Sequence, residues 1–286
     1  MCPPSLPPIV SPAWVAEHLA QPDLVILDAS WYLPVASRDA RAEYLAGHLP
    51  GAVHVDLDAI SDPSSELPHT LPDAAHFSRV AGGLGIGNAD TVVIYDGSGN
   101  NLSAARLWWM FRGFGHAAVA VLDGGFAAWR RAGMPLETGE VERLPQRYRA
   151  TGTIAGVADL VAVRDALASG RAQVVDLRSR GRFTGHDPEP RPGLPSGHMA
   201  GAISLPFTEL VDGDGVALPA TDLRVRLAAA GVDLARPIIA TCGSGTSACN
   251  LLLGLERLGV TSATLYDGSW TEWATRGMPI ATGDST

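Results

Sequence analysis

The sequence predicts an α/β protein made of two tandem domains, each a mainly parallel sheet flanked by helices. Three observations lead to this prediction. The 286 residues exceed one average core and suit two. The second half repeats motifs of the first half in the same order, which indicates a duplicated unit. Within each half, short apolar runs alternate with helical patterns, as in a parallel sheet covered on both faces.

A short β-branched run begins the repeat in each half. Residues 24–30 (LVILDAS) return as residues 173–179 (QVVDLRS), and both apolar runs end at an aspartate. A Gly-His motif follows, with residues 47–52 (GHLPGA) returning as residues 197–202 (GHMAGA). Short apolar runs ended by polar residues are typical of buried strands.

The next strand of each half leads into a glycine-rich loop. Residues 92–99 (VVIYDGSG) return as residues 238–245 (IIATCGSG), so Cys242 occupies the position of Asp96. Helical patterns follow at 103–112 and 248–258. Because only the second half has a thiol here, the first half is predicted to be a non-catalytic support.

The last shared motif and the stretch between the two halves together indicate the domain limits. Asp-Gly-Gly-Phe at 123–126 returns as Asp-Gly-Ser-Trp at 267–270. A charged stretch without apolar periodicity at 139–153 is the predicted linker. The sequence therefore predicts a non-catalytic domain at residues 1–140 and a catalytic domain at residues 154–286.

Composition narrows the classes of partner. Hydrophobic residues make up 46% of the chain and charged residues 18%, as in a packed globular protein. The formal net charge of −9 disfavours nucleic acids and anionic membranes, since both attract clustered Lys and Arg. The chain starts with no basic segment before an apolar run, and no stretch is long and apolar enough to span a membrane. We expect a cytoplasmic protein.

The three cysteines are Cys2, Cys242 and Cys249. They are too few for a multi-bridge disulfide framework, and no C-x-x-C pair indicates a metal site. No metal or organic cofactor is implied. Cys2 lies near the N-terminus and Cys249 one turn into a helix, so neither is expected to be catalytic.

Cys242 is the candidate nucleophile because of its place in the predicted fold. It ends a strand, and ligands bind at the carboxyl edge of open α/β sheets. Gly243 and Gly245 allow backbone N–H groups to turn inward, and the next helix directs its positive dipole end at the same point. This setting favours a reactive thiolate. The alternative is a small buried core cysteine, although core cysteines seldom open a glycine-rich turn.

These tandem Gly-His, Asp-Gly and Cys-loop motifs resemble the rhodanese superfamily over essentially the whole chain. The resemblance implies a sulfurtransferase that carries sulfur as a persulfide on Cys242. The loop Cys-Gly-Ser-Gly is similar to the branch that uses 3-mercaptopyruvate. The branch that uses thiosulfate typically has basic residues after the cysteine, which suits a dianion.

The resemblance also implies a binding set for the donor. Arg182 and Arg191 match the family's carboxylate-binding arginines, and a guanidinium group suits bidentate carboxylate recognition. The alternative is two solvated loop arginines. Gly243, Gly245, Thr246 and Ser247 would complete the loop around the sulfur, where the family commonly has Val then Thr in place of Thr246 and Ser247.

Three further residues are implied in proton handling by the same resemblance. Ser244 matches the loop serine that protonates or polarises the ketone as sulfur leaves, and a helix-capping role is its alternative. Asp58 and His69 match positions that support this serine across the domain interface, and a plain surface role is the alternative for His69.

The implied reaction moves sulfur from a small-molecule donor to a thiol or cyanide, with a thioredoxin-like protein among the candidate acceptors, and releases pyruvate. Thiosulfate sulfurtransferase is the first alternative. A phosphatase or arsenate reductase would need an arginine where this chain has Ala248. A sulfur carrier or binding module without turnover is the third alternative.

Overall fold

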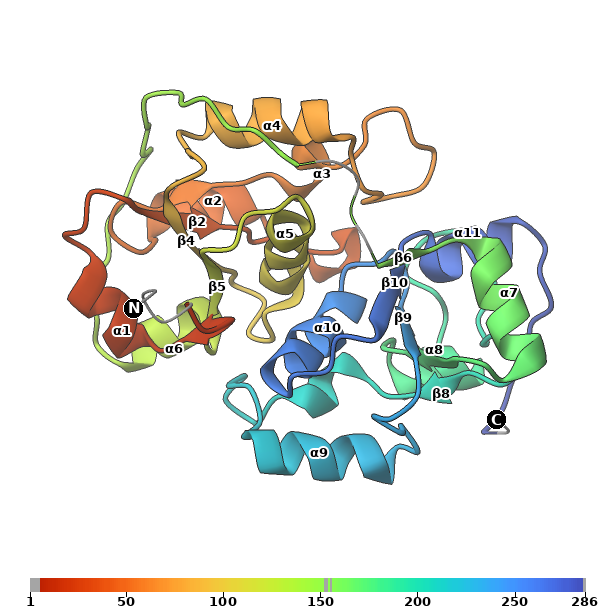
Figure 1. The fold of residues 1–286 in the computed structure, drawn as a ribbon. Helices are drawn as coiled ribbons and strands as arrows, with labels where there is room; N and C mark the ends of the chain where they lie inside the picture. The colour runs from red at the N-terminus through yellow and green to blue at the C-terminus, as the bar shows by residue number, and fades with distance from the viewer. Residues whose placement is uncertain (1–5, 152–153, 155, 285–286) are drawn as a thin grey trace. The chain divides into compact units, whose positions relative to one another are not determined.

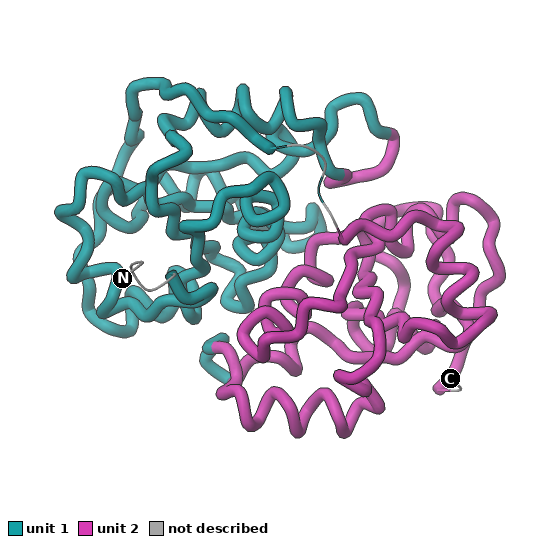
Figure 2. The backbone as a smooth tube through the Cα atoms, viewed as in Figure 1, with its two compact units in different colours: residues 1–65, 71–155, 213–216 teal, residues 66–70, 156–212, 217–286 magenta. Residues whose placement is uncertain are grey.

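The computed structural model describes residues 6–151, 154 and 156–284. The chain forms two compact units, which are coloured separately in Figure 2. Unit 1 comprises residues 1–65, 71–155 and 213–216, and unit 2 comprises residues 66–70, 156–212 and 217–286. Each half of the repeat thus forms a unit, and each half contributes one short segment to the other unit. The domain limits at residues 140 and 154 stay predictions.

Unit 1 is built around a parallel sheet with the strand order β1-β5-β4-β2-β3, of which Figure 1 labels β2, β4 and β5. The residues of β2 are all buried, because helices cover a parallel sheet on both faces. β2 pairs with β4 along its whole length, from Leu24 opposite Thr91 to Asp28 opposite Tyr95. The strands are β1 (Ile9–Val10), β2 (Leu24–Asp28), β3 (Val53–His54), β4 (Thr91–Tyr95) and β5 (Val119–Leu122).

Helices of unit 1 pack on this sheet through apolar side chains. Val15 and Trp129 join Ile26, Val93 and Tyr95 in a buried cluster. A different helix, α5, packs against β4 and β5. The elements are α1 (Pro12–His18), η1 (Pro34–Ala36), α2 (Ala40–Ala46), α3 (Leu57–Ile60), α4 (Ala74–Gly83), α5 (Leu102–Gly113) and α6 (Gly125–Arg131).

Unit 2 repeats this sheet with the order β6-β10-β9-β7-β8. Its strand pairs are parallel, and β9 lies between β10 and β7. The strands are β6 (Val157–Ala158), β7 (Gln173–Asp176), β8 (Ile203–Ser204), β9 (Ile238–Thr241) and β10 (Ala263–Tyr266).

The core of unit 2 also has a helix layer on each side of the sheet. Val163, Phe183 and Trp270 pack with Val174 and Ile239 in one cluster. The buried leucines of α10 lie outside that cluster, and α10 packs against β9 and β10. The elements are α7 (Leu160–Ser169), α8 (Arg180–Thr184), η2 (Phe207–Leu210), α9 (Ala220–Ala229), α10 (Ala248–Arg257) and α11 (Ser269–Thr275).

The two parallel sheets with flanking helices confirm the predicted α/β fold class. In the part of the chain that the structure describes, no helix has the length and apolarity needed to cross a membrane. Over the same residues, no group of three or more His, Cys, Asp or Glu side chains is arranged to hold a metal ion. Cys2 lies outside the described residues.

Candidate active site at the Cys242 loop

Cys242 directly follows β9, and α10 begins at Ala248. The buried residues of β9 carry the chain through the core and place Cys242 at the carboxyl edge of the sheet, where α/β proteins bind ligands. Cys242 is 2% exposed and its thiol is not in a disulfide. We call residues 242–247 the Cys242 loop.

The first turn of α11 holds the start of the Cys242 loop. The backbone N–H of Trp270 donates to the carbonyl of Cys242 at 2.9 Å. The N–H and hydroxyl of Thr271 both donate to the carbonyl of Gly243, at 3.0 and 2.7 Å. These bonds connect the loop to a buried helix, so the loop backbone is fixed by the core of unit 2.

The same loop presents backbone donors. Within the described residues, the N–H groups of Gly243, Ser244, Thr246 and Ser247 have no protein acceptor. Gly245 has a φ of 75°, a left-handed conformation that favours glycine and lets the chain turn within the loop. Backbone N–H groups at the start of a helix bind anions. The loop can therefore hold an anionic sulfur.

Arg182 and Arg191 both reach this loop. Arg182 lies in α8, and Arg191 lies in the segment that follows it. A Cβ at Gly243 would lie 2.9 Å from Nη2 of Arg182 and 3.7 Å from Nη1 of Arg191. Nη2 of Arg191 donates to Oγ of Ser244 at 3.2 Å. The missing side chain at Gly243 thus leaves room for two guanidinium groups beside the cysteine loop.

A buried ion network orients Arg182. Glu189, whose side chain is 2% exposed, accepts from Nε and Nη2 of Arg182 at 3.1 and 2.5 Å. It also accepts from Nη1 of Arg178 at 2.7 Å, and Arg178 pairs with Asp176. Burial opposes the charge of Arg178, but Asp176 and Glu189 raise the pKa of its guanidinium above the ordinary value. One edge of the Arg182 guanidinium is therefore engaged by the protein.

Sequence reasoning missed Asp176, Arg178 and Glu189 as parts of the site. A signal was present, because Glu189 lies between the two predicted arginines and Asp176 ends a strand at the same sheet edge. An acidic residue beside two arginines indicates an ion pair that fixes one of them.

The structure brings His69 to the Cys242 loop. His69 lies in segment 66–70, which belongs to unit 2, and is 3% exposed. Its Nδ1 lies 3.1 Å from Oγ of Ser244 and 3.2 Å from Oγ1 of Thr246. An unprotonated Nδ1 can accept a hydrogen bond from either hydroxyl. Ser244 thus lies between an imidazole and Arg191.

The other two predicted residues have different surroundings. Asp58 lies in the first turn of α3 in unit 1, and its Oδ2 accepts from Nε1 of Trp31 at 3.2 Å. Its support of Ser244 stays a prediction. Ser247 is the N-cap residue of α10, but its side chain makes no capping bond. Because Ser244 is not the N-cap residue, the structure also gives no support to the capping alternative for Ser244.

The corresponding loop of unit 1 contains its own anion. Oδ1 of Asp96 accepts from the N–H and hydroxyl of Ser98 at 2.8 and 2.5 Å. Its Oδ2 accepts from the N–H groups of Ser103 and Ala104 at 3.0 and 2.9 Å. Asp96 is fully buried, so its carboxylate occupies the donors at the start of α5.

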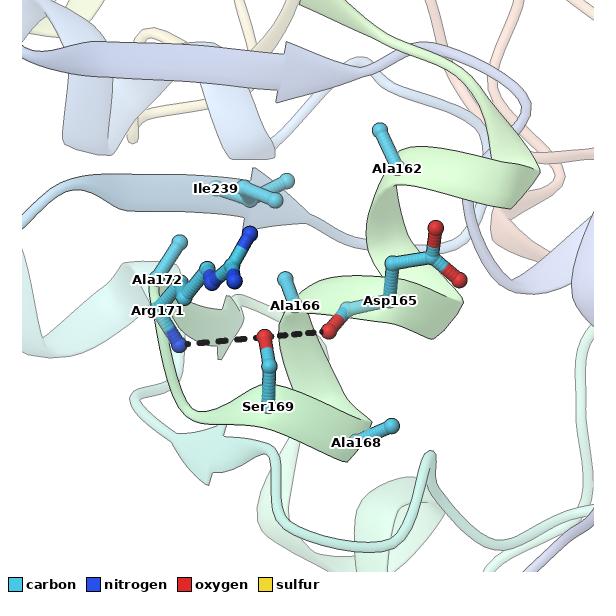
Figure 3. Close-up of a pocket in the computed structure, with 8 residues that line it drawn as sticks. All are labelled: Ala162, Asp165, Ala166, Ala168, Ser169, Arg171, Ala172 and Ile239. Carbon is cyan, nitrogen blue, oxygen red and sulfur yellow. Dashed lines mark hydrogen bonds between the residues drawn. The ribbon is translucent and has the colours of Figure 1, made fainter.

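Figure 3 shows a pocket of unit 2 between α7 and β9. Ala166 and Ser169 of α7 line it together with Ala172 and Ile239. Ala172 precedes β7 and Ile239 lies near the start of β9, so this pocket is at the amino ends of these strands. Cys242 lies at the opposite ends, and the pocket is not part of the candidate active site.

Comparison with known proteins gives matches over nearly the whole chain. The Rhodanese-like domain family matches residues 11–132 and 159–276. The 3-mercaptopyruvate sulfurtransferase of Homo sapiens is 45% identical over 276 residues, covering 95% of this chain and 93% of that protein. The Arabidopsis thaliana protein named thiosulfate/3-mercaptopyruvate sulfurtransferase 1, mitochondrial, is 42% identical over 301 residues, covering 98% and 79%.

Among solved structures, the chain is similar to the 3-mercaptopyruvate sulfotransferase SseA of Escherichia coli. The TM-score is 0.82 at 38% sequence identity, and the match covers 92% of this chain and 98% of that one. The similarity thus includes both halves of the repeat.

Proposed function

Since this chain belongs to the rhodanese-like family, we propose that it is a sulfurtransferase that moves sulfur from 3-mercaptopyruvate to a thiol or cyanide, through a persulfide on Cys242, and releases pyruvate. One observation carries the proposal: the loop headed by the Cys242 thiol lies beside two arginines. This arrangement supplies a nucleophile for sulfur and a cationic partner for a carboxylate.

In the first half-reaction, the Cys242 thiolate attacks the thiol sulfur of 3-mercaptopyruvate. A sulfur–sulfur bond forms and the carbon–sulfur bond breaks, and its electron pair leaves with the carbon as the enolate of pyruvate. Protonation of that carbon gives pyruvate. The two sulfur atoms are oxidised to a persulfide while the carbon is reduced, so no external oxidant is needed. Loop N–H groups stabilise the anionic sulfur.

Arg182 and Arg191 hold the donor in this scheme. Their guanidinium groups bind its carboxylate and leave the sulfur facing Cys242. Ser244 polarises the ketone or passes a proton to the enolate, and His69, at 3.1 Å from its hydroxyl, exchanges the proton with it.

In the second half-reaction, an acceptor attacks the outer sulfur and Cys242 leaves as a thiolate. Cyanide gives thiocyanate, and a thiol gives a new persulfide. Covalent storage of sulfur between two substrates produces ping-pong kinetics. A thioredoxin-like dithiol protein is a proposed acceptor, and the cytoplasm is the proposed location, although one relative has a mitochondrial name.

Thiosulfate is the alternative donor, because that relative's name includes it. No basic residue occurs at 243–247 of this chain, whereas a dianion would gain from positive charge close to the sulfur. We therefore expect a higher kcat/KM with 3-mercaptopyruvate than with thiosulfate. A clear preference for thiosulfate would overturn the choice of donor and leave the persulfide on Cys242 standing.

Intact-protein mass spectrometry after incubation with 3-mercaptopyruvate tests the proposal. The wild-type protein should gain the mass of one sulfur atom and lose it when a thiol is added. Cys242→Ser should gain none and have no steady-state turnover, because a hydroxyl cannot store sulfur this way.

Cys249→Ser is the matched control, since Cys249 lies within α10 and a serine hydroxyl can still donate to the carbonyl of Gly245 as the thiol does. It should keep most activity. Turnover by Cys242→Ser would refute the mechanism. Persulfide formation by the wild-type protein without steady-state turnover would instead favour a sulfur carrier.

A further inference from the structure

The hydroxyl of Ser269 joins the two ends of the turn that begins with Cys242. Its Oγ accepts from the N–H of Cys242 at 3.2 Å and from the N–H of Gly245 at 3.0 Å. It donates to the carbonyl of Tyr266 at 2.8 Å. One donor and two acceptor sites are all that a hydroxyl has. The bonding capacity of this fully buried group is therefore used completely.

Ser269 has a backbone conformation that is costly for its residue type. Its φ is +50°, a region where a residue with a Cβ is strained. The corresponding residue of the first half is Gly125, with a φ of +55°. The next residues of the two halves also match, because Phe126 donates to the carbonyl of Asp96 at 3.0 Å as Trp270 does to Cys242. A glycine adopts this conformation without strain, yet the second half has a serine.

The two loops differ in where their acceptor comes from. In unit 1 the Asp96 carboxylate accepts from the N–H groups of Ser98, Ser103 and Ala104. In unit 2 an oxygen from α11 enters the turn, and it binds a different set of N–H groups, those of Cys242 and Gly245. Ser269 thus fixes the two ends of the turn and leaves the N–H groups of Gly243, Ser244, Thr246 and Ser247 available.

We propose that Ser269 is a positioning residue for sulfur transfer, whose hydroxyl holds the N–H groups of Cys242 and Gly245 so that the remaining loop donors can surround the sulfur. The inference rests on the proposed function. Strain at a special φ persists where function requires it, and the strained serine adjoins the reactive thiol and is absent from the half without one.

Two substitutions at Ser269 distinguish the effect of losing the hydroxyl from the effect of relieving the backbone strain. Ser269→Ala removes the hydroxyl and keeps a Cβ at positive φ, whereas Ser269→Gly removes the hydroxyl and relieves the strain. The readouts are the single-turnover rate of persulfide formation from 3-mercaptopyruvate, the steady-state KM and kcat, and the Tm.

Both variants should form the persulfide about ten- to a hundredfold more slowly than wild type, since each loses two hydrogen bonds that shape the donor set. KM should change by less than about threefold, because Arg182 and Arg191 still bind the carboxylate. The Tm of Ser269→Gly should equal or exceed that of Ser269→Ala. Ser169→Ala, which removes a hydroxyl bonded to Asp165 at the other edge of unit 2, is the control and should keep the wild-type rate.

Wild-type rates in both variants would overturn the inference. Recovery of activity in Ser269→Gly but not in Ser269→Ala would also overturn it, because the strain and not the hydroxyl would then matter. If neither variant folds, Ser269→Cys, which is close in size but a weaker acceptor, must show the same slow persulfide formation. Failure of all three to fold would assign the hydroxyl to the fold alone. Absence of a wild-type persulfide would instead refute the proposed function.

Discussion

Arg182 and Arg191 approach the same loop but have different partners. Arg182 donates two bonds to buried Glu189, whereas Arg191 donates to Ser244. Removal of Arg182 therefore leaves a buried carboxylate with one of its two arginine partners, and removal of Arg191 changes the surroundings of a loop hydroxyl. The two arginines share one predicted role in binding and differ in their expected effect on stability.

Arg182→Ala and Arg191→Ala should each lower kcat/KM for 3-mercaptopyruvate about ten- to a hundredfold, which corresponds to a charge-assisted hydrogen bond of about 1.5–3 kcal/mol. The loss should appear mainly in KM. Lysine at either position should rescue activity only in part, because it cannot form a planar two-pronged contact. Steady-state kinetics measures the effect, with Arg164→Ala, which removes an exposed side chain of α7, as the control. Unchanged kcat/KM in both alanine variants would mean that the carboxylate binds elsewhere.

Arg182→Ala should in addition lower the free energy of unfolding by about 1–3 kcal/mol, because it leaves Glu189 under-bonded in the interior. Denaturant titration measures this. A normal stability together with a raised KM would show that Glu189 finds another partner.

At the residue scale, the sequence was sufficient to predict which side chains lie at the site, but not most of the contacts that they make. The family motif identified Arg182, Arg191, Ser244 and His69, and the structure brings them to one loop. Ser269 could not be predicted as a loop acceptor, since its bonds join segments that are distant in sequence. The catalytic and binding roles of Arg182, Arg191, Ser244 and His69 stay predictions.

At the scale of elements, the strand, loop and helix around Cys242 occur twice, with the Cys242 thiol at the head of one loop and the Asp96 carboxyl group at the head of the other. Predicted helices at 103–112 and 248–258 correspond to α5 (Leu102–Gly113) and α10 (Ala248–Arg257). The agreement is good because apolar periodicity within one helix is a local property. The filling of the unit 1 loop by the Asp96 carboxylate was not predicted, because it depends on where three N–H groups and two hydroxyls point.

Asp96→Ala should destabilise unit 1 by about 2–5 kcal/mol, because it leaves buried N–H groups of the loop and of α5 without an acceptor. Asp96→Asn should cost less, since its carbonyl oxygen can still accept. Scanning calorimetry of both variants against wild type measures the effect. Equal stability of Asp96→Ala and wild type would show that water replaces the carboxylate.

At the scale of the whole molecule, each unit has its own sheet and buried cluster. The duplicated motifs and the alternation of strand and helix patterns were sufficient to predict this architecture, because both can be read from the sequence alone. The assignment of residues 66–70 to unit 2 and of residues 213–216 to unit 1 was not predictable. Those short segments have no periodicity of their own, and tertiary packing alone decides where they belong.

Two histidines, buried His116 and half-buried His54, make the stability of unit 1 depend on pH. His116 is 2% exposed, and its Nε2 donates to the carbonyl of Asp90 at 2.9 Å. Burial lowers the pKa of His116 below its ordinary value of 6.5, and burial likewise lowers the pKa of His54. In the unfolded chain these imidazoles bind protons at a higher pH than in the folded protein.

Stability depends on pH through the difference in bound protons between the two states. For a histidine whose pKa is lower in the folded state, the unfolded state binds more protons near pH 6. The stabilisation is therefore complete above about pH 6.5 and is lost as the pH falls through the folded-state pKa.

Denaturant unfolding between pH 5 and pH 8, followed by a probe in unit 1, should show this loss. His116→Gln, although less stable at pH 8, should have a shallower slope between these limits, because one titrating group is removed and His54 remains. An unchanged slope would contradict the assignment to His116 and leave other groups as the source of the acid sensitivity.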